Sequence, residues 1–595
     1  MTVPMTFVSR VRDRVERSGD TCSFTFVGGA DPLDERVLSF AALDERARCI
    51  AAWLAGRPRR RAVLLMYPAG PAFLEAFVGC LYAGAVAIPA PLPTTDPRAL
   101  ERAARIIGDA DVGLLLTDSA HEDELRRWIE ETGLENVDCV ALDDASATVL
   151  PEASAWTMPD IGPDDIAYLQ YTSGSTSEPR GVVVTHRNLL QNVHDIWRLF
   201  GSPEHGVGVG WLPHYHDMGL VGQFLMPLQR GLSIVFTSPL SFIRRPVLWL
   251  ELISRHRAEY TAAPDFAYDW CTAYIPDDQI RDLDLSCLKL AMNGAEPVRA
   301  ATLDAFTRRF EPVGFRRTAW LPAYGMAEAT LLVSGTAKTE EPTVLAVDAG
   351  ELERDRAVPS DGPAAIRLVS SGRPLSLDVR VVEPRSREAL PDGEIGEIWL
   401  SGASVAGGYW NDPAGTAETF GGRLATGEGP FLRTGDLGFL RAGEVFVTGR
   451  LKDIVIVNGR NIYPQDIEAA ARDVHPALGP SAAFTADGQG EHVVLVQEVR
   501  TNRLGALTAP ELADEVEAAL RDRLRLPGVS VVLVRNGRVE RTTSGKVRRR
   551  RMRELFLTGG LDPVHRSLSG SLAAVLERRA GAVSAAEATP VAVER

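Results

Sequence analysis

The sequence lacks the short cysteine patterns that would place it among zinc-binding or disulfide-bonded proteins. None of its six cysteines forms a CxxC pair, and none lies near a histidine at zinc-ligand spacing. We therefore expect reduced core thiols, as in a cytoplasmic protein. The six are Cys22, Cys49, Cys80, Cys139, Cys271 and Cys287.

The chain also lacks a segment suited to secretion or to crossing a membrane. Arg10, Arg12 and Asp13 interrupt any apolar run near the N-terminus, which argues against a signal peptide. The longest uncharged stretch, 76–93, contains Gly84 and several prolines that would break a spanning helix. We expect no stable membrane insertion.

Positive charge is in deficit. The 595 residues include 64 Lys and Arg against 79 Asp and Glu, a formal net charge of −15. This balance argues against nucleic-acid binding and favours solubility. The 45% of hydrophobic and 24% of charged residues are typical of a soluble globular protein, and the length suggests about three to four hydrophobic cores.

Up to about residue 340, short apolar runs alternate with longer helical patterns. The run 62–67 predicts a buried strand and 71–82 a helix, and the alternation returns with strand 166–171 and helix 186–200, which Thr185 would cap. Apolar strands linked by helices indicate parallel sheets covered on both faces, so the predicted fold class is α/β with doubly wound parallel sheets. Further strands are expected at 85–88, 112–117, 234–237, 260–263 and 288–292.

Two changes of texture divide the rest of the chain. Short strands with Gly-rich turns predict a β-rich subdomain from about 365 to 450. An α+β segment follows, in which Thr508 and Glu511 form a capping-box pattern that opens a helix. We expect a large N-terminal domain at 1–450, a small C-terminal domain at 451–566 and a flexible tail at 567–595.

The strongest chemical signal is the segment 171–190, YTSGSTSEPRGVVVTHRNLL. A buried strand runs directly into a loop of small hydroxyl residues around a glycine, where N–H and O–H groups can face a polyphosphate. The loop lacks the GxxxxGK(S/T) spacing of the Walker A motif. A single loop of this composition is usually an ordinary connection, so phosphate binding needs further support.

Four more motifs follow in order: YGMAEAT at 324–330, FLRTGDLGF at 431–439, GRLKDIVIVNGRNIYPQDIE at 449–468 and RTTSGKVR at 541–548. Together with the first motif they resemble, over about residues 20 to 560, the superfamily of acyl-CoA synthetases, luciferases and peptide-synthetase adenylation domains. The resemblance implies an enzyme that activates a carboxylic acid as its adenylate, with ATP and Mg²⁺ as cofactors and a mobile C-terminal domain.

The resemblance also implies which residues bind ATP and the metal. Glu328 would hold Mg²⁺, Asp436 would accept hydrogen bonds from the ribose hydroxyls, and Arg450 would assist nearby. The other cofactor-binding residues are those of the phosphate loop, Thr172, Ser173, Gly174, Ser175 and Thr176, and those of the adenine side, Gly294, Ala295, Tyr324, Gly325, Met326 and Ala327.

Three residues are implied to be catalytic: Lys546, His216 and Glu328. A carboxylic acid of pKa about 4–5 is already ionised at neutral pH, so its attack on phosphorus needs no general base. Lys546, supplied by the C-terminal domain, would stabilise charge on the phosphoryl oxygens, and His216 matches a gate between the ATP and acyl sites. Outside these motifs, such a lysine or glutamate is usually a solvated surface residue.

Several stretches resemble the fatty acyl-AMP ligases more than the CoA ligases: LQYTSGST, WLPHYHDMGL, NGAEPV and GRNIYPQDIE. The long segment 336–370 matches an extra segment by which that branch disfavours CoA. We expect Val344, Leu345, Val347 and Leu352 to anchor it on the large domain. The branch implies a fatty-acid substrate and transfer of the acyl group to the phosphopantetheine thiol of an acyl carrier protein in trans, which would begin a polyketide or lipopeptide.

Other functions stay open: a medium- or long-chain acyl-CoA ligase, an amino-acid adenylation domain, and a non-catalytic adenylate-binding protein. The chain reads HDMG where an amino-acid-activating domain would show an FDxS-like motif, and both Glu328 and Lys546 are present. The run Arg548, Arg549, Arg550 and Arg551 has two interpretations, a solvated charged helix face or a docking patch for an acidic carrier protein.

Overall fold

The computed structural model describes residues 5–28, 34–57, 62–93, 97–134, 136–172, 179–338, 340–363, 365–457, 460–486, 492–526, 528–542, 545–573 and 576. The chain divides into two compact units. The N-terminal unit comprises Met1–Val347, Ala365–Thr434 and Gly438–Val447, and the C-terminal unit comprises Asp348–Ala364, Gly435–Leu437 and Thr448–Arg595.

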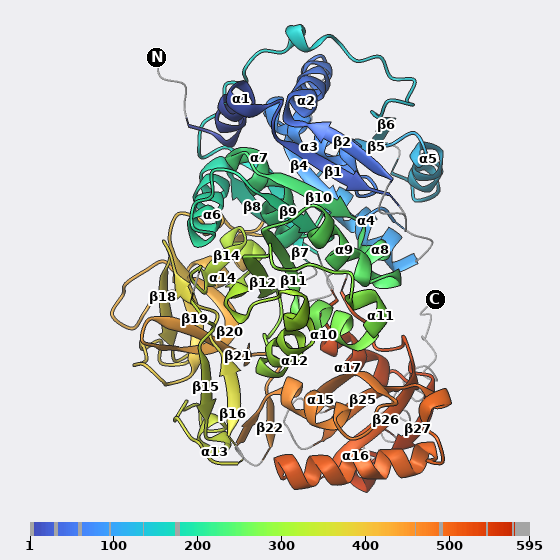
Figure 1. The fold of residues 1–595 in the computed structure, drawn as a ribbon, viewed down its shortest axis with the longest axis vertical. Helices are drawn as coiled ribbons and strands as arrows, with labels where there is room; N and C mark the ends of the chain where they lie inside the picture. The colour runs from blue at the N-terminus through green and yellow to red at the C-terminus, as the bar shows by residue number, and fades with distance from the viewer. Residues whose placement is uncertain are drawn as a thin grey trace, which may run out of the picture. The chain divides into compact units, whose positions relative to one another are not determined.

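A six-stranded sheet, drawn in blue to cyan in Figure 1, lies in the N-terminal unit. Its order is β6-β5-β3-β4-β7-β8, and only β7 and β8 pair antiparallel. The first strands are buried along their whole length, as expected of parallel strands covered on both faces. The bounds are β3 Ala62–Met66, β4 Val86–Ala90, β5 Leu114–Thr117, β6 Asp138–Ala141, β7 Ile166–Thr172 and β8 Arg180–Thr185.

The second large sheet has nine strands in the order β17-β14-β13-β12-β11-β9-β10-β1-β2. From β13 to β1 all neighbours are parallel, and antiparallel strands complete both edges. The bounds are β1 Ser23–Val27, β2 Glu35–Ser39, β9 Val207–Gly210, β10 Ser233–Thr237, β11 Tyr260–Pro264, β12 Leu290–Gly294, β13 Trp320–Gly325, β14 Leu332–Gly335 and β17 Arg373–Pro374.

Helices connect these strands, and local sequence fixes several of their ends. Pro71 occupies the first turn of α3, where its missing N–H costs nothing, and Thr185 and Asn188 close a reciprocal capping box on α6. The helices are α1 Phe7–Ser18, α2 Phe40–Ala55, α3 Pro71–Tyr82, α4 Pro97–Asp109, α5 Glu122–Glu131, α6 His186–Leu199, α7 Met226–Arg230, α8 Pro239–Arg244, α9 Val247–Arg255, α10 Asp265–Tyr274, α11 Asp277–Ile280 and α12 Ala300–Phe310. A π-helical turn spans Met218–Leu225, and short 3-10 turns span Ala153–Ala155, Glu311–Val313, Arg317–Ala319 and Ala327–Ala329.

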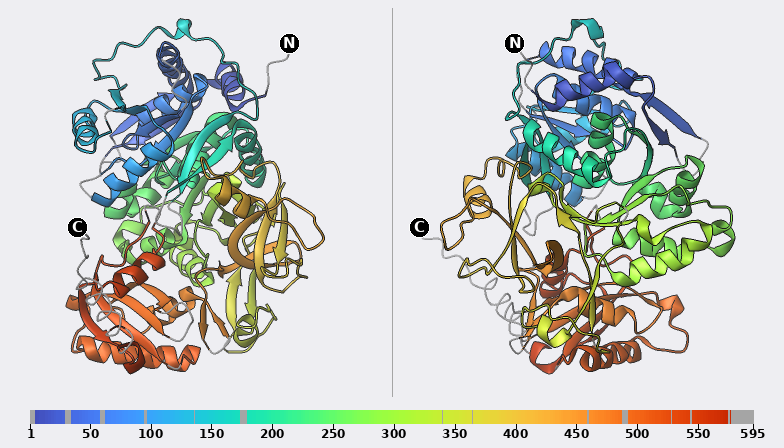
Figure 2. Two further views of the ribbon diagram at one scale, coloured as in Figure 1. Left: turned by 180° about the vertical axis from the view of Figure 1, so that it is seen from behind. Right: turned by 60° about the vertical axis from the view of Figure 1, so that its left-hand side comes forward.

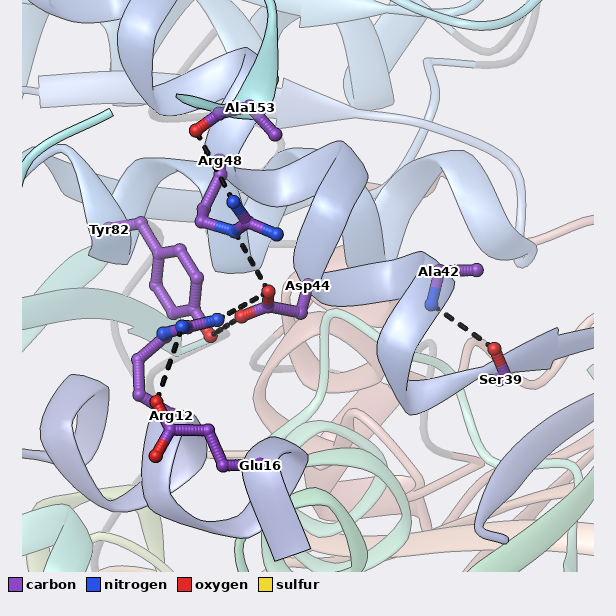
Figure 3. Close-up of polar contacts among 8 residues, drawn as sticks. All are labelled: Arg12, Glu16, Ser39, Ala42, Asp44, Arg48, Tyr82 and Ala153. Atoms are coloured by element: carbon purple, nitrogen blue, oxygen red, sulfur yellow. Dashed lines mark hydrogen bonds and ion pairs between the residues drawn. The ribbon is translucent and has the colours of Figure 1, made fainter. Parts of the chain in front are cut away.

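A polar network joins α1, α2 and α3 at the N-terminal end of this unit (Figure 3). The buried Asp44 carboxylate accepts hydrogen bonds from Arg12, from Arg48 at 2.9 Å and from the Tyr82 hydroxyl at 2.8 Å. Arg48 also donates to the carbonyl of Ala153 at 3.3 Å. Both oxygens of the carboxylate accept hydrogen bonds, and these bonds offset the free-energy cost of burying its charge. The same bonds connect the three helices.

The β-rich part of the N-terminal unit has a four-stranded sheet in the order β18-β19-β20-β21 and a hairpin of β15 and β16. Tyr324 and Ala329 pack into the same apolar cluster as this sheet, so the sheet supports the loop that follows β13. The bounds are β15 Val344–Val347, β16 Ile366–Val369, β18 Asp378–Val382, β19 Gly396–Ser401, α14 Pro413–Phe420, β20 Leu432–Arg441 and β21 Glu444–Arg450.

The C-terminal unit is an α+β structure around the sheet β24-β25-β26-β27. Apolar residues of α15 and α16 pack on one face of this sheet and those of α17 on the other, with α16 at the lower edge of Figure 1. The bounds are α13 Ala349–Leu352, β22 Val455–Val457, β23 Arg460–Ile462, α15 Pro464–Arg472, β24 Leu478–Thr485, β25 Val493–Val499, a 3-10 turn Thr501–Arg503, α16 Ala509–Leu524, β26 Val529–Arg535, α17 Arg549–Leu557 and β27 Pro563–Ser567.

Residues 348–364 pack with the C-terminal unit, although they lie within the predicted large domain. Arg460 donates to both Glu353 carboxylate oxygens, and the Asn461 amide donates to the Asp355 carboxylate at 2.9 and 3.0 Å. Leu352 is buried and belongs to this unit, which corrects the expectation that it anchors the segment on the large domain.

The predicted α/β class is confirmed, with parallel sheets in the N-terminal unit and an α+β C-terminal unit. The structure adds β8 and the π-helical turn, neither of which was predicted from the sequence. No helix of the described chain is long and apolar enough to cross a membrane. Most of the predicted tail, 567–595, lies outside the described residues.

Candidate active site

The adenine-side residues lie where β12 and β13 end, next to each other in the nine-stranded sheet. β12 ends at Gly294, and its neighbour β13 carries Tyr324 and ends at Gly325. A Cβ at Gly294 would stand 2.8 Å from the Ala323 carbonyl oxygen, and one at Gly325 would stand 2.0 Å from the Leu331 carbonyl oxygen. Both positions therefore need glycine. The carboxyl edge of parallel strands is where α/β proteins place ligands.

Two backbone irregularities follow these strand ends. Ala295 has a φ of +65°, and Thr330, two residues after Glu328, has a φ of +70°. Left-handed conformations cost about 1–3 kcal/mol at residues other than glycine, and they cluster at ligand-binding sites. The buried Thr330 hydroxyl donates to the Ser404 carbonyl at 2.7 Å, which holds this loop in place.

The Glu328 carboxylate is oriented by Tyr409, whose hydroxyl donates to Glu328 Oε1 at 2.9 Å. Burial raises the pKa of Tyr409, and the Glu328 charge raises it further, so the phenol stays protonated and acts as the donor. The Glu328 carbonyl oxygen accepts from the Ala406 N–H at 2.9 Å. Side chain and backbone of Glu328 are therefore both bonded to the segment 406–409.

The phosphate loop is bounded by described residues on both sides. Thr172 ends β7 and lies opposite Arg180, the first residue of β8. The Arg180 guanidinium lies over the Tyr409 ring, 5.1 Å from its centroid, and 3.8 Å from Asp412. Tyr409 thus brings Glu328 together with the flanks of the loop. The predicted loop residues Ser173, Gly174, Ser175 and Thr176 lie outside the described residues.

A buried asparagine ties the first motif to the second. Asn192 of α6 donates to the carbonyls of Ala329 and Leu332 at 3.1 and 2.9 Å, and it accepts from the Leu332 N–H at 3.0 Å. The side chain is fully buried and its amide is satisfied on both sides. The loop that carries Met326, Ala327 and Glu328 is therefore fixed to the helix that follows the phosphate loop.

His216 lies in the connection after β9 and is partly exposed. Its Nδ1 is 2.7 Å from the Asp217 carboxylate, and the amide of Gln170 in β7 donates to the Tyr215 carbonyl at 2.8 Å. This bond links the strand before the phosphate loop to the histidine segment. The neighbouring His214 is buried, which lowers its pKa to about 3 and keeps it neutral in the core.

Asp436 and Arg450 meet within the C-terminal unit. Arg450 Nε lies 3.0 Å from Asp436 Oδ1, and the Asp436 side chain is only 8% exposed against 51% for Arg450. Gly435, with a φ of +70°, accepts a hydrogen bond from the Leu451 N–H, so the two segments run together. Asp436 and Arg450, which were predicted to bind near the ribose and phosphate, therefore form an ion pair with each other.

Lys546 lies in a tight turn of the C-terminal unit. Its carbonyl accepts from the Thr542 N–H at 2.7 Å, and its N–H donates to the Thr542 hydroxyl at 3.1 Å. The turn is closed by pairing between Arg541 and Val547. Lys546, Asp436 and Arg450 share the C-terminal unit, whereas the other predicted residues that are described belong to the N-terminal unit.

The arginine run after Lys546 is mostly engaged in ion pairs. Arg549 donates to both oxygens of the buried Glu468 carboxylate at 2.7 and 2.8 Å, and Arg548 and Arg551 both lie within ion-pair distance of Glu540. These contacts favour a structural role over the docking patch for a carrier protein. Within the described chain, no group of three or more His, Cys, Asp or Glu side chains is arranged to hold a metal ion.

The sequence reading missed Tyr409, Asn192 and Gln170, which position the site without matching a motif that names them. Gln170 and Asn192 lie just before and just after the first motif. Each is a polar residue on an otherwise apolar strand or helix face, and this pattern could have indicated a buried polar side chain with a specific partner. Tyr409 stands about 80 residues from Glu328 in an irregular segment, where no periodic pattern indicates burial.

Residues 11–410 match the family model of AMP-binding enzymes. The chain belongs to the AMP-binding enzyme family. The match covers the strand ends, the phosphate loop and the Glu328–Tyr409 pair described above, and it stops before Asp436, Arg450 and Lys546.

Individual AMP-binding enzymes are similar to this chain over nearly its whole length. A medium-chain-fatty-acid acyl-carrier-protein ligase of Moorena producens is 43% identical over 542 residues, which are 88% of this chain and 90% of the relative. A long-chain-fatty-acid–AMP ligase of Mycolicibacterium smegmatis is 34% identical and covers 93% of this chain and 94% of its own.

The solved structures agree with these relatives. A fatty acyl-adenylate ligase of Legionella pneumophila, in complex with acyl adenylate and pyrophosphate, is 35% identical, with a TM-score of 0.73 and coverage of 95% and 98%. A chain from a study of fatty acyl-adenylate ligases of E. coli and L. pneumophila is 30% identical, with a TM-score of 0.84 and coverage of 94% and 98%. The predicted superfamily and its fatty acyl-AMP ligase branch are confirmed.

Proposed function

We propose that this protein activates a fatty acid with ATP to acyl-AMP and pyrophosphate, and then passes the acyl group to the phosphopantetheine thiol of a separate acyl carrier protein. The observation that carries the proposal is the Tyr409 junction, which holds the Glu328 carboxylate beside the strands that flank the phosphate loop. The substrate class follows the names of the two relatives, both of which are ligases of fatty acids, and the carrier protein follows the name of the Moorena producens ligase.

We assign the nucleotide to the carboxyl edge of the nine-stranded sheet. Gly294, Ala295 and Tyr324 would contact the adenine there, because both glycine positions at this edge admit no side chain. Hydroxyl and N–H groups of the phosphate loop would bind the phosphates of ATP. Asp436 would accept hydrogen bonds from the ribose, with Arg450 beside it.

The residues present also fit a magnesium ion. Glu328 offers a hard carboxylate ligand whose Oε1 is already oriented by a protonated phenol, and the phosphates of ATP and water would complete the coordination. A bound Mg²⁺ offsets phosphate charge during phosphoryl transfer. Our assignment to this chain is that Glu328 holds the ion and Tyr409 holds Glu328.

In the first half-reaction the ionised carboxylate of the fatty acid attacks the α-phosphorus of ATP. The new carbon–oxygen–phosphorus linkage forms as the bond from the α-phosphorus to the bridging oxygen breaks, and pyrophosphate leaves. We assign Lys546 to stabilise the charge on the phosphoryl oxygens. His216, with Nδ1 near the Asp217 carboxylate, would line the passage between nucleotide and acyl group.

In the second half-reaction the thiolate of the carrier attacks the acyl carbon, a thioester forms, and AMP leaves with the oxygen that linked it. Lys546 must give way to the incoming thiol, which requires the C-terminal unit to move. We propose that both steps take place in the cytoplasm, where thiols such as the six cysteines here stay reduced.

The test is to incubate the enzyme with ATP, Mg²⁺ and a series of fatty acids, and to detect acyl-AMP by mass spectrometry. Parallel reactions contain CoA, a phosphopantetheinylated carrier protein, or neither. We expect acyl-AMP from fatty acids in all reactions, and acyl transfer to the carrier but little to CoA. Acyl-CoA formed as fast as acyl-AMP would assign the chain to the acyl-CoA ligases, and activity on amino acids alone would reject a fatty-acid substrate.

A further inference from the structure

A cavity of about 700 Å³ lies in the N-terminal unit among α1, α6 and α7, and none of its lining residues was assigned to the candidate active site. The three helices contact one another, and Figures 1 and 2 draw them side by side in dark blue and cyan to green. One carboxylate, Asp13, lines the cavity. The cavity is also lined by five arginines and a histidine: Arg10, Arg14, Arg17, Arg187, Arg230 and His194.

Helix α1 presents a row of arginines to this cavity. Arg10, Arg14 and Arg17 recur at three- and four-residue intervals, so they share one face of the helix. Val8 on the opposite face is buried, as are Phe7 and Val11 beside the row, and Arg12 bonds to the buried Asp44 (Figure 3). These contacts fix the rotation of α1 and direct the arginine row into the cavity.

The facing wall adds a partly buried arginine at the end of α7. The Arg230 guanidinium lies 4.5 Å from the ring centroid of Trp197, and its Nη2 is 3.1 Å from His194 Nδ1. Arg230 Nε and Gln229 Oε1 are buried and find no hydrogen-bond partner in the described part of the chain. Such atoms are rare in folded proteins, and they leave a donor and an acceptor available to a ligand.

The positive charges in the cavity are poorly compensated. Burial, together with the charges of Arg14 and Arg10, lowers the pKa of Arg230 to about 10. Arg187 is paired with Asp164 at 2.6 Å, but over the described residues no carboxylate lies within ion-pair distance of Arg10, Arg14, Arg17 or Arg230. The arginines around the cavity repel one another, which costs stability, although the chain as a whole has a net charge of −15. A bound anion would offset this repulsion.

We propose that this cavity is a second ligand site, which binds a small molecule bearing two or more phosphate charges. The volume suits a small molecule rather than a protein surface. Guanidinium groups arriving from separate helices match an anion with several oxygens, since each planar fork can bind two of them. Met5 and Leu190 add apolar wall for an organic part of the ligand.

Isothermal titration calorimetry with sodium tripolyphosphate as the probe tests the proposal on the full chain. The double variant Arg14→Gln/Arg230→Gln removes the charges from two walls of the cavity. The matched control is Arg198→Gln, an exposed arginine on α6 that does not line the cavity. If the proposed function holds, the phosphate loop binds tripolyphosphate equally in all three proteins, so the measured quantity is the difference between the proteins.

We expect wild type and Arg198→Gln to bind one more equivalent of tripolyphosphate than the double variant, or to bind it at least tenfold more tightly at 50 mM salt. Added NaCl should weaken this event. Repeating the titration with orthophosphate and with ADP distinguishes an inorganic ligand from a phosphorylated organic one. The adenylation rate of the double variant should be unchanged, because neither arginine was assigned to the active site, and its melting curve in phosphate-free buffer shows that it is folded.

Equal stoichiometry and affinity in all three proteins would overturn the proposal. It would also be overturned if none of tripolyphosphate, orthophosphate and ADP distinguished the double variant from the control. Since adenylation is measured alongside, failure of the fatty-acid assignment and failure of this second site would be seen separately.

Discussion

Replacing Tyr409 by phenylalanine removes one hydroxyl and leaves the rest of the site in place. The ring keeps its contact with Phe420, whose centroid lies 5.3 Å away, and its position under the Arg180 guanidinium. What disappears is the 2.9 Å hydrogen bond to Glu328 Oε1. Glu328 then keeps its backbone bond to Ala406 but loses the group that orients its carboxylate.

The expected magnitude follows from the kind of bond. A hydrogen bond to a charged group contributes about 1.5–3 kcal/mol, and the lower end applies because both side chains are only partly buried. If the bond is used fully in the transition state, about 1.5 kcal/mol corresponds to roughly a tenfold loss in kcat/KM, since 1.4 kcal/mol is a factor of ten. The Mg²⁺ concentration that gives half-maximal rate should rise as well.

The assay is pyrophosphate exchange at a series of Mg²⁺ concentrations, with urea unfolding of the same preparations. The matched control is Tyr260→Phe, which removes a tyrosine hydroxyl that donates to the Ser233 carbonyl at 3.2 Å, at the amino end of β11. Tyr260→Phe should lose about 0.5–1.5 kcal/mol of unfolding free energy and Tyr409→Phe about 1.5 kcal/mol, but only Tyr409→Phe should lose activity. If Tyr409→Phe stays within twofold of the control at every Mg²⁺ concentration, the role assigned to Tyr409 is wrong.

Three other predictions concern the C-terminal unit. Lys546→Ala should reduce adenylation at least a hundredfold, in kcat more than in KM, with an unchanged urea curve, and activity within threefold of wild type would contradict the role of this lysine. Glu353→Ala removes the ion pair between the segment 348–364 and Arg460, which is worth about 1 kcal/mol at this partial exposure. The ratio of acyl-CoA to acyl-AMP should then rise several-fold, and an unchanged ratio would argue against that segment as a restraint. Burial, together with the charges of Glu468 and Glu353, raises the pKa of Asp466 to about 7. The folded state therefore holds a proton that the unfolded state releases, stability falls as the pH rises from about 4 to 7, and Asp466→Asn should remove this slope, as urea unfolding at several pH values would show.

Much of the fold could be predicted because local sequence determines it. Helix α3 begins and ends at the predicted residues, since Pro71 starts it and Gly84, with a φ of +65°, follows its end. The capping box of α16 was visible as Thr508 and Glu511. β8 escaped prediction because RGVVVT follows a loop motif directly, and antiparallel pairing with β7 is a tertiary contact that the strand pattern does not encode.

The residues of the candidate site could be predicted only where they lie within a recognisable sequence motif. Arg549 lies in a run of arginines whose sequence context is uniform, yet its partners Glu468 and Asp453 stand far away along the chain. A charge run therefore cannot be separated into paired and solvated members without the tertiary structure. The same holds for Leu352, whose apolar spacing indicates burial but not which unit buries it.

The composition of the C-terminal unit bears on the exchange of parts between related enzymes. The unit is not one continuous stretch, because residues 348–364 belong to it through Glu353 and Asp355. A chimera joined at Thr448 would keep Arg460 and Asn461 and replace the residues they bind. A chimera of this unit should therefore carry residues 348–364 together with the segment from Thr448 onward, or restore both carboxylates in the recipient.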